Sequence, residues 1–96
     1  DRRAAVSEFI TRINWGLSGQ RFLLDWEDGE VWLRRDIRLL ALPDVRTIAQ
    51  WFEASCFLMD GYYPALMNVV YRGMAPSQAF EQGAADLKRL LSRSDE

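Results

Sequence analysis

The sequence predicts one α+β domain in which helices cover an antiparallel β-hairpin. An Asp28-Gly29 pair separates two short stretches of alternating apolar and polar residues, which is typical of a hairpin. Apolar residues at helical spacing occur before this hairpin and again after it. The 96 residues, of which 49% are hydrophobic and 27% charged, suffice for one ordinary globular core, so we expect a single domain over 1–96.

The first helix is predicted over residues 2–15. Its apolar residues fall three or four positions apart and therefore form one stripe along the helix. The residues of this stripe are Val6, Phe9, Ile10, Ile13 and Leu17.

The hairpin is predicted over residues 21–39, with Asp28 and Gly29 as a two-residue type I′ loop. Such a loop needs a positive φ at both positions, which glycine adopts freely and aspartate tolerates. The register that follows pairs Trp26 with Val31, Leu24 with Leu33 and Phe22 with Arg35. A slip by one residue would mix apolar and polar side chains on both faces, so this register is favoured.

The two faces of the hairpin are expected to differ. Val31, Leu33, Ile37 and Leu39 continue the apolar face along the second strand. The opposite face carries Leu23, Trp32 and Arg34. An exposed aromatic residue on a sheet face can anchor a partner protein, so these three residues are the candidate partner-binding site.

A second helix is predicted from Val45 to Tyr71, with Asp44 as its N-cap. Pro64 lacks the N–H that would continue the helical hydrogen bonds, so we expect either a kink near residues 60–64 or a break into two helices. Cys56 lies among apolar positions, and we expect it to be a buried structural thiol.

This second helix is predicted to be apolar around more than half of its circumference. One stripe contains Val45, Ile48, Ala49, Phe52, Cys56, Met59, Tyr63, Met67 and Val70, and another contains Trp51, Leu58, Tyr62, Leu66 and Val69. One hairpin and one neighbouring helix are too little to cover both stripes. Either the other helices wrap this helix, or a second chain or a missing segment covers it.

The third helix is predicted to begin at Pro76, because proline is well tolerated in the first turn. Its inner face contains Ala79, Phe80, Gly83, Ala84, Leu87, Leu90 and Leu91. The tail over 92–96 has no apolar residue to bury, so we expect it to fray.

Composition excludes several classes of function. The formal net charge is −2 and charges of both signs are interspersed, so no basic footprint for nucleic acid is present. No apolar run approaches the ~20 residues needed to cross a bilayer, so no membrane insertion is expected. The single cysteine fits a reducing compartment, which predicts a cytoplasmic protein. The absence of histidine removes the commonest general base and the commonest metal ligand.

The acidic turn, with Asp25, Glu27, Asp28 and Glu30, is the one stretch that invites a metal-binding interpretation. A calcium loop places glycine at its sixth position and glutamate at its twelfth. Counting from Asp25, glycine is fifth and Asp36 is twelfth, so the spacing favours a solvated turn. We therefore expect no metal, no cofactor and no catalytic residue. A small metal-dependent enzyme that uses this turn is the less favoured alternative.

Several short segments, in the same order and spacing, resemble the YbjN-like family of bacterial proteins, which are described as sensory transduction regulators. They are NWGL at 14–17, GQRFLLD at 19–25, DGEV at 28–31, YYPALM at 62–67, YRG at 71–73 and AP at 75–76. The resemblance implies a fold like that of the type III secretion chaperones. It also implies a further helix and strands before Asp1, so this chain is expected to be a fragment or a short relative. It carries over no catalytic residues.

These observations predict a non-enzymatic interaction domain that binds a protein partner or a second copy of itself. A partner segment is expected to dock around Leu23, Trp32 and Arg34, with backbone pairing at the sheet edge. The alternative is a structural domain whose role is to dimerise a larger regulator.

Overall fold

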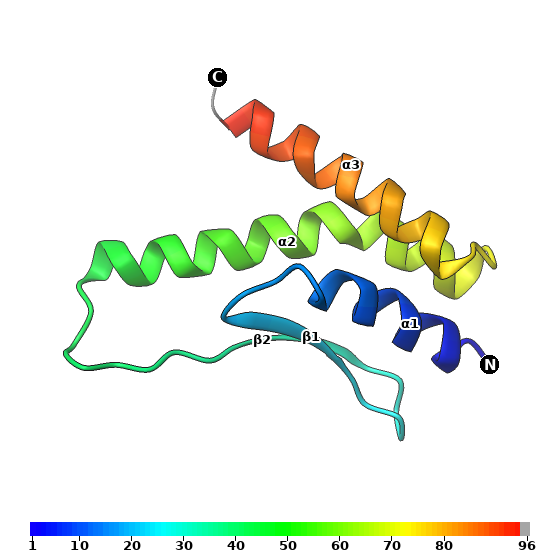
Figure 1. Cartoon of the computed structure of the whole chain (residues 1–96), viewed down its shortest axis with the longest axis horizontal. Helices are drawn as coiled ribbons and strands as arrows, with labels where there is room; N and C mark the ends of the chain where they lie inside the picture. Colours follow the sequence, from blue (N-terminus) through cyan, green and yellow to red (C-terminus); the bar gives the residue numbers. More distant parts are fainter. Residues whose placement is uncertain (95–96) are drawn as a thin grey trace.

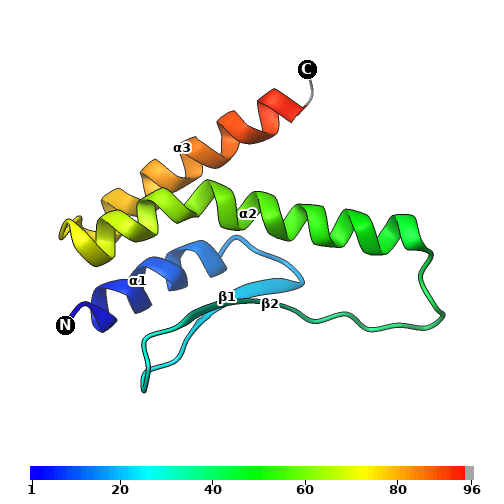
Figure 2. The same cartoon turned by 180° about the vertical axis from the view of Figure 1, so that it is seen from behind.

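The computed structural model describes residues 1–94 as three helices and one two-stranded antiparallel sheet, which confirms the predicted α+β class. The elements follow the order α1 (Arg3–Asn14), β1 (Gln20–Leu24), β2 (Val31–Arg35), α2 (Val45–Tyr71) and α3 (Pro76–Ser94). The long helix α2 lies across the molecule, with the hairpin on one side of it, and α3 packs against both α2 and α1 (Figure 1 and Figure 2).

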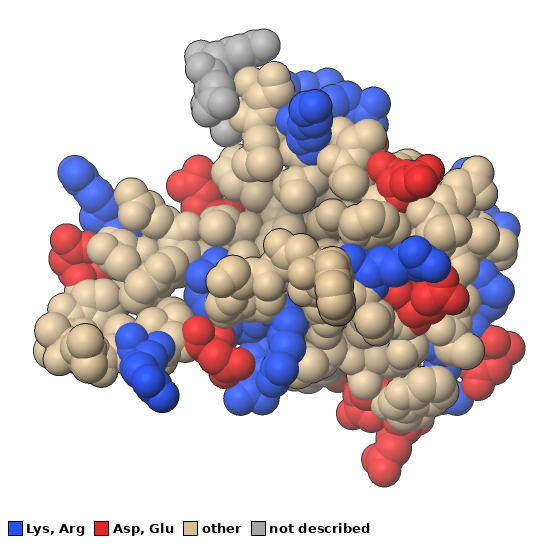
Figure 3. Space-filling model, viewed as in Figure 1, with Lys and Arg blue, Asp and Glu red and all other residues tan. Residues whose placement is uncertain are grey.

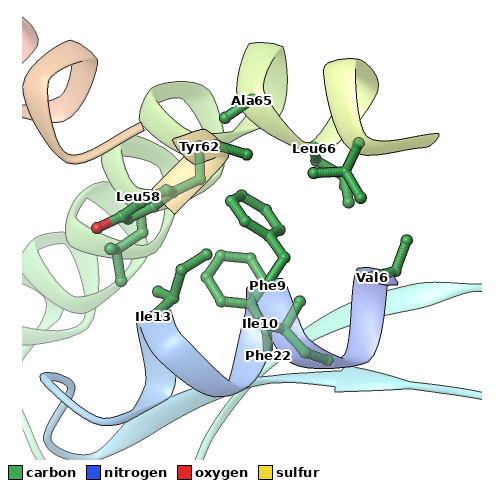
Figure 4. Close-up of a cluster of buried hydrophobic side chains, with 11 residues drawn as sticks. Val6, Phe9, Ile10, Ile13, Phe22, Leu58, Tyr62, Ala65 and Leu66 are labelled. Carbon is green, nitrogen blue, oxygen red and sulfur yellow. The ribbon is translucent and has the colours of Figure 1, made fainter. Parts of the chain in front are cut away.

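The core forms where α1, the hairpin and α3 meet the C-terminal half of α2. The predicted stripe of α1 supplies Val6, Phe9, Ile10 and Ile13, which are all buried. Tyr62 of α2 lies among these side chains (Figure 4). Its ring meets Phe9 and Phe22 edge-on, each at 6.3 Å between centroids, and stacks near Phe80 at 6.5 Å. Aromatic rings prefer these geometries, which contribute beyond the area they bury.

Two buried glycines allow α2 and α3 to approach each other closely. A Cβ atom on Gly83 would overlap the ring of Tyr62, and a Cβ atom on Gly61 would lie 2.9 Å from Cβ of Leu87. The predicted inner face of α3 is correct at Ala79 and Gly83, which are buried, and at Phe80 and Leu87, which are half-buried. Leu91, which was predicted on the same face, is 46% exposed. The helix itself runs to Ser94, and residues 95–96 of the predicted frayed tail lie outside the described residues.

The hairpin register differs from the prediction by two residues. Leu24 pairs with Val31, Phe22 with Leu33, and Leu23 with Trp32. The loop is longer than expected because the backbone N–H of Asp25 donates to the carbonyl of Glu30 at 2.9 Å, and that of Gly29 donates to Asp25 at 2.8 Å. The type I′ loop is wrong as well, because among residues 1–94 only glycines have positive φ, with Gly29 at +79°.

A shift of two residues leaves the predicted faces unchanged, because side chains alternate with a period of two. Phe22 is buried, and Leu24, Val31 and Leu33 pack against the core. The continuation of this face is wrong: β2 ends at Arg35, and Ile37 and Leu39 are exposed.

Helix α2 is continuous through Pro64, so the predicted break into two helices does not occur. Asp44 is the N-cap, as predicted, and its carboxylate accepts the backbone N–H of Thr47 at 2.8 Å. Leu58, Tyr62, Leu66 and Val69 form the buried stripe. Cys56 belongs to the other stripe and is exposed, so the expected burial of this thiol is wrong.

Candidate interaction surfaces

The outer face of the hairpin brings the three predicted partner-binding residues together. Leu23 and Trp32 are cross-strand neighbours, and Arg34 lies two positions along β2 on the same face. Trp32 is 58% exposed, as predicted, whereas Leu23 is half-buried. The guanidinium Nε of Arg34 donates to the carboxylate of Asp36 at 3.0 Å, and both side chains remain exposed. This face therefore presents an indole beside a cation that is only partly neutralised.

The two edges of the sheet are not equivalent. On β1, the side-chain amide of Asn14 both donates to the carbonyl of Phe22 at 2.9 Å and accepts its N–H at 2.8 Å. Asn14 thereby occupies this edge as a neighbouring strand would. On β2, the peptide groups of Val31 and Leu33 point away from β1, and within residues 1–94 they have no such partner. An open edge of this kind can pair with an extended segment of another chain.

A larger exposed apolar surface lies over the segment 36–44 and the start of α2. Leu40 is 99% exposed, Leu42 94%, Val45 82% and Phe52 72%. In the face shown in Figure 3, this end of the molecule, at the left, presents uncharged surface between a few basic and acidic side chains. Soluble chains rarely expose contiguous apolar patches of this kind unless they bind something.

The exposed leucines of segment 36–44 were not predicted from the sequence. The strand pattern predicts Leu39 on a buried face, and it predicts no role for Leu40 or Leu42. The signal that could have found them is local: Leu39-Leu40-Ala41-Leu42 has no alternation of apolar and polar residues and ends at Pro43. A run without alternation next to a proline does not continue a half-buried strand.

An apolar groove lies beneath the N-terminal half of α2. Its volume is about 430 Å³, and it is bounded by α2, the last turns of α3 and the loop before β1. The apolar lining residues are Leu17, Ala54, Phe57, Leu58, Leu87 and Leu91, and Gln20, Gln50 and Glu53 form its polar rim. Ser55 Oγ donates to Oε1 of Gln20 at 3.0 Å beside this groove, which ties α2 to the start of β1.

The acidic turn acts as a structural turn. The carboxylate of Asp25 accepts the N–H of Glu27, and that of Asp28 accepts the N–H of Glu30, each at 2.9 Å. Within residues 1–94, no group of three acidic, cysteine or histidine side chains is close enough to hold a metal ion. Burial raises the pKa of the Tyr62 hydroxyl, because desolvation disfavours the charged phenolate.

None of the helices in the described part of the chain is both long and apolar enough to span a membrane. Comparison of the chain with models of protein families, with curated proteins and with solved structures gave no match. The resemblance to YbjN-like proteins therefore stays a prediction, and the function is inferred from the exposed surfaces of the chain.

Proposed function

We propose that this chain is a non-enzymatic, cytoplasmic interaction domain that binds a protein partner or a second copy of itself. The observation that carries this proposal is the exposed apolar surface, which includes Trp32 on the hairpin and Leu40, Leu42 and Phe52 beyond it. Leaving so much apolar area in water is unfavourable unless a partner covers it. The YbjN-like resemblance, with its secretion-chaperone fold and regulatory role in bacteria, is in keeping with this function.

Partner binding at the hairpin uses both the open edge and the outer face. An extended partner segment adds a strand beside β2 and pairs with the free peptide groups of Val31 and Leu33. Its alternate side chains then pack on Trp32, while acidic groups are attracted by Arg34 and by Arg21 on the neighbouring strand. Backbone pairing supplies affinity, and the indole and the two cations supply selectivity.

Selection of binding peptides from a displayed random library tests this proposal directly. We expect extended peptides that bind the wild-type chain, and Trp32→Ala should weaken their binding by about tenfold or more, since central aromatic anchors dominate such interfaces. Trp15→Ala is the matched control, because Trp15 is 93% exposed but lies at the end of α1, away from the hairpin's outer face.

The edge-pairing mechanism has its own test. N-methylation of alternate backbone amides in a selected peptide removes the donors that pair with β2, so one of the two methylation patterns should abolish binding. The proposal is contradicted if no peptide is enriched, or if Trp32→Ala and Trp15→Ala weaken binding equally.

The alternative, a dimerisation domain, is favoured by one separate observation. The N-terminal half of α2 presents an apolar stripe that no segment among residues 1–94 covers.

A further inference from the structure

Helix α2 has a second apolar face in its N-terminal half, which we call the outward stripe. It consists of Val45, Ile48, Ala49, Phe52 and Cys56, all of them exposed. At 3.6 residues per turn, Phe52 lies about 120° around the helix from the buried Leu58. The stripe therefore lies apart from Leu58 on α2, and its exposure shows that no segment among residues 1–94 covers it, although Met59, one turn beyond it, packs against the core.

Three exposed charges follow one flank of α2 at a spacing of seven residues: Arg46 and Glu53 beside the outward stripe, and Asp60 beyond its end. Arg46 and Glu53 are seven residues apart, so they lie within about 20° of each other around the helix but roughly 10 Å apart along its axis. This separation prevents them from pairing with each other. Within residues 1–94, neither side chain has an ion pair or a hydrogen bond.

A second copy of α2, packed antiparallel, would complement these charges. In an antiparallel pair related by a twofold axis, the same flank of each helix meets, and residue i contacts residue j while j contacts i. With the axis between Ala49 and Gln50, Arg46 of each copy lies opposite Glu53 of the other. Ile48 and Phe52 then pack across the axis, and both ion pairs form at once.

Other arrangements of two helices lose this complementarity. In a parallel pair, the flank with Arg46 and Glu53 meets the opposite flank, where Trp51 and Ser55 carry no charge. An antiparallel pair shifted by one heptad would set Arg46 opposite Asp60 of the other copy, but it would also bring the two Glu53 carboxylates together, where they repel. The charge pattern therefore favours the antiparallel orientation, and it favours the register in which Arg46 faces Glu53 because that register has no like-charge contact on this flank.

We propose that the outward stripe binds a second copy of this chain, with the two α2 helices antiparallel and Arg46 paired with Glu53 of the other copy. The inference deepens the self-association part of the proposed function and concerns a surface separate from the hairpin.

Sedimentation equilibrium over a range of concentrations tests the proposal. The wild-type chain should form a dimer, and Phe52→Asp should weaken association at least a hundredfold by placing a carboxylate at the centre of the interface. Tyr71→Asp is the matched control, because Tyr71 is 79% exposed at the other end of α2 and should leave the dimer intact. Circular dichroism of each variant checks that the helices are retained.

Charge reversal tests the orientation. Arg46→Glu and Glu53→Arg should each weaken the homodimer by about tenfold, since each creates two like-charge contacts, and the double variant should restore it. A mixture of the two single variants should form the heterodimer in preference to either homodimer. If these reversals have no effect although Phe52→Asp dissociates the dimer, the antiparallel register is overturned.

The two proposals can fail separately. A chain that stays monomeric at all concentrations but binds the selected peptides overturns this inference and leaves the peptide-binding function in place. A chain that forms a Phe52-dependent dimer but selects no peptide overturns the peptide-binding function and leaves this inference in place. Peptide binding that is lost with Trp32→Ala and unchanged by Phe52→Asp would show two independent surfaces.

Discussion

The two halves of α2 belong to one continuous helix but have different surroundings. In the C-terminal half, Tyr62, Ala65 and Val69 are buried by α1, α3 and Phe22 of the hairpin. In the N-terminal half, Val45 is 82% exposed and Phe52 is 72% exposed. Both halves carry apolar stripes of similar length. The difference shows that an apolar stripe identifies a surface that needs a partner, whereas the neighbouring elements decide whether that partner lies within the chain.

Replacing a valine by alanine in each half of α2 should give the largest difference in the free energy of unfolding. Val69→Ala should lower the free energy of unfolding by about 1.5–3 kcal/mol, because Val69 is wholly buried and the deletion leaves a cavity. Val45→Ala should change it by less than about 0.5 kcal/mol in the monomer. Urea denaturation at low protein concentration measures both values. Equal effects of the two substitutions would mean that the N-terminal half is covered after all.

The sequence was sufficient to predict the elements but not the identity of the buried stripe on α2. Helical spacing places Phe52 and Tyr62 on different stripes, yet both stripes are apolar, so spacing alone cannot show which of them is buried. Non-local contacts decide which stripe is buried, above all the rings of Phe9, Phe22 and Phe80 around Tyr62. The same ambiguity explains the error at Cys56, which lies on the stripe that stays exposed.

The hairpin illustrates a different limit. Within the two strands the predicted faces were correct, because alternation fixes them, and Trp32 is exposed as a result. Trp26, predicted to pair with Val31, lies beyond β1 and is 58% exposed. The register was wrong because Asp28-Gly29 is also compatible with a longer loop, in which Gly29 alone has positive φ. The hydrogen bonds of the Asp25 and Asp28 carboxylates to the loop stabilise the longer form, and no residue pattern distinguishes these bonds in advance.

The close contact between α3 and the C-terminal half of α2 can be broken by a single methyl group. Gly83→Ala directs a Cβ into the buried ring of Tyr62, and overpacking of this kind costs about 1–3 kcal/mol. The higher helix propensity of alanine offsets about 1 kcal/mol of this. Thermal unfolding should therefore show a modest net loss of stability.

A double-mutant cycle separates this clash from other effects of Gly83→Ala. In a Tyr62→Leu background the ring is absent, so Gly83→Ala should become neutral or stabilising. If the cost is unchanged in that background, the overlap with Tyr62 is not its cause.

The smallest expected effect concerns the cap of the N-terminal half. About 13 residues of α2 precede Leu58, its first buried residue. A helix of this length is only marginally stable by itself, so the N-cap contributes to its stability. The hydrogen bonds from Thr47 lower the pKa of the Asp44 carboxyl below its ordinary value of 3.8. The ionised form is thus the one stabilised by folding. Its contribution is present above pH 3.8 and is lost as the pH falls through the lowered folded-state pKa.

Asp44→Ala should therefore destabilise the chain slightly at pH 7, and the difference from wild type should shrink below pH 3.8. Asp44→Asn is the matched control: it keeps the acceptor without the charge, so its difference from Asp44→Ala should not depend on pH. Amide hydrogen exchange localises the effect, because losing the cap should speed exchange over residues 47–50 and leave residues 62–69 unchanged. Faster exchange over both regions would show that the two halves of α2 unfold as one unit. The two halves would then differ in solvent exposure but not in local stability.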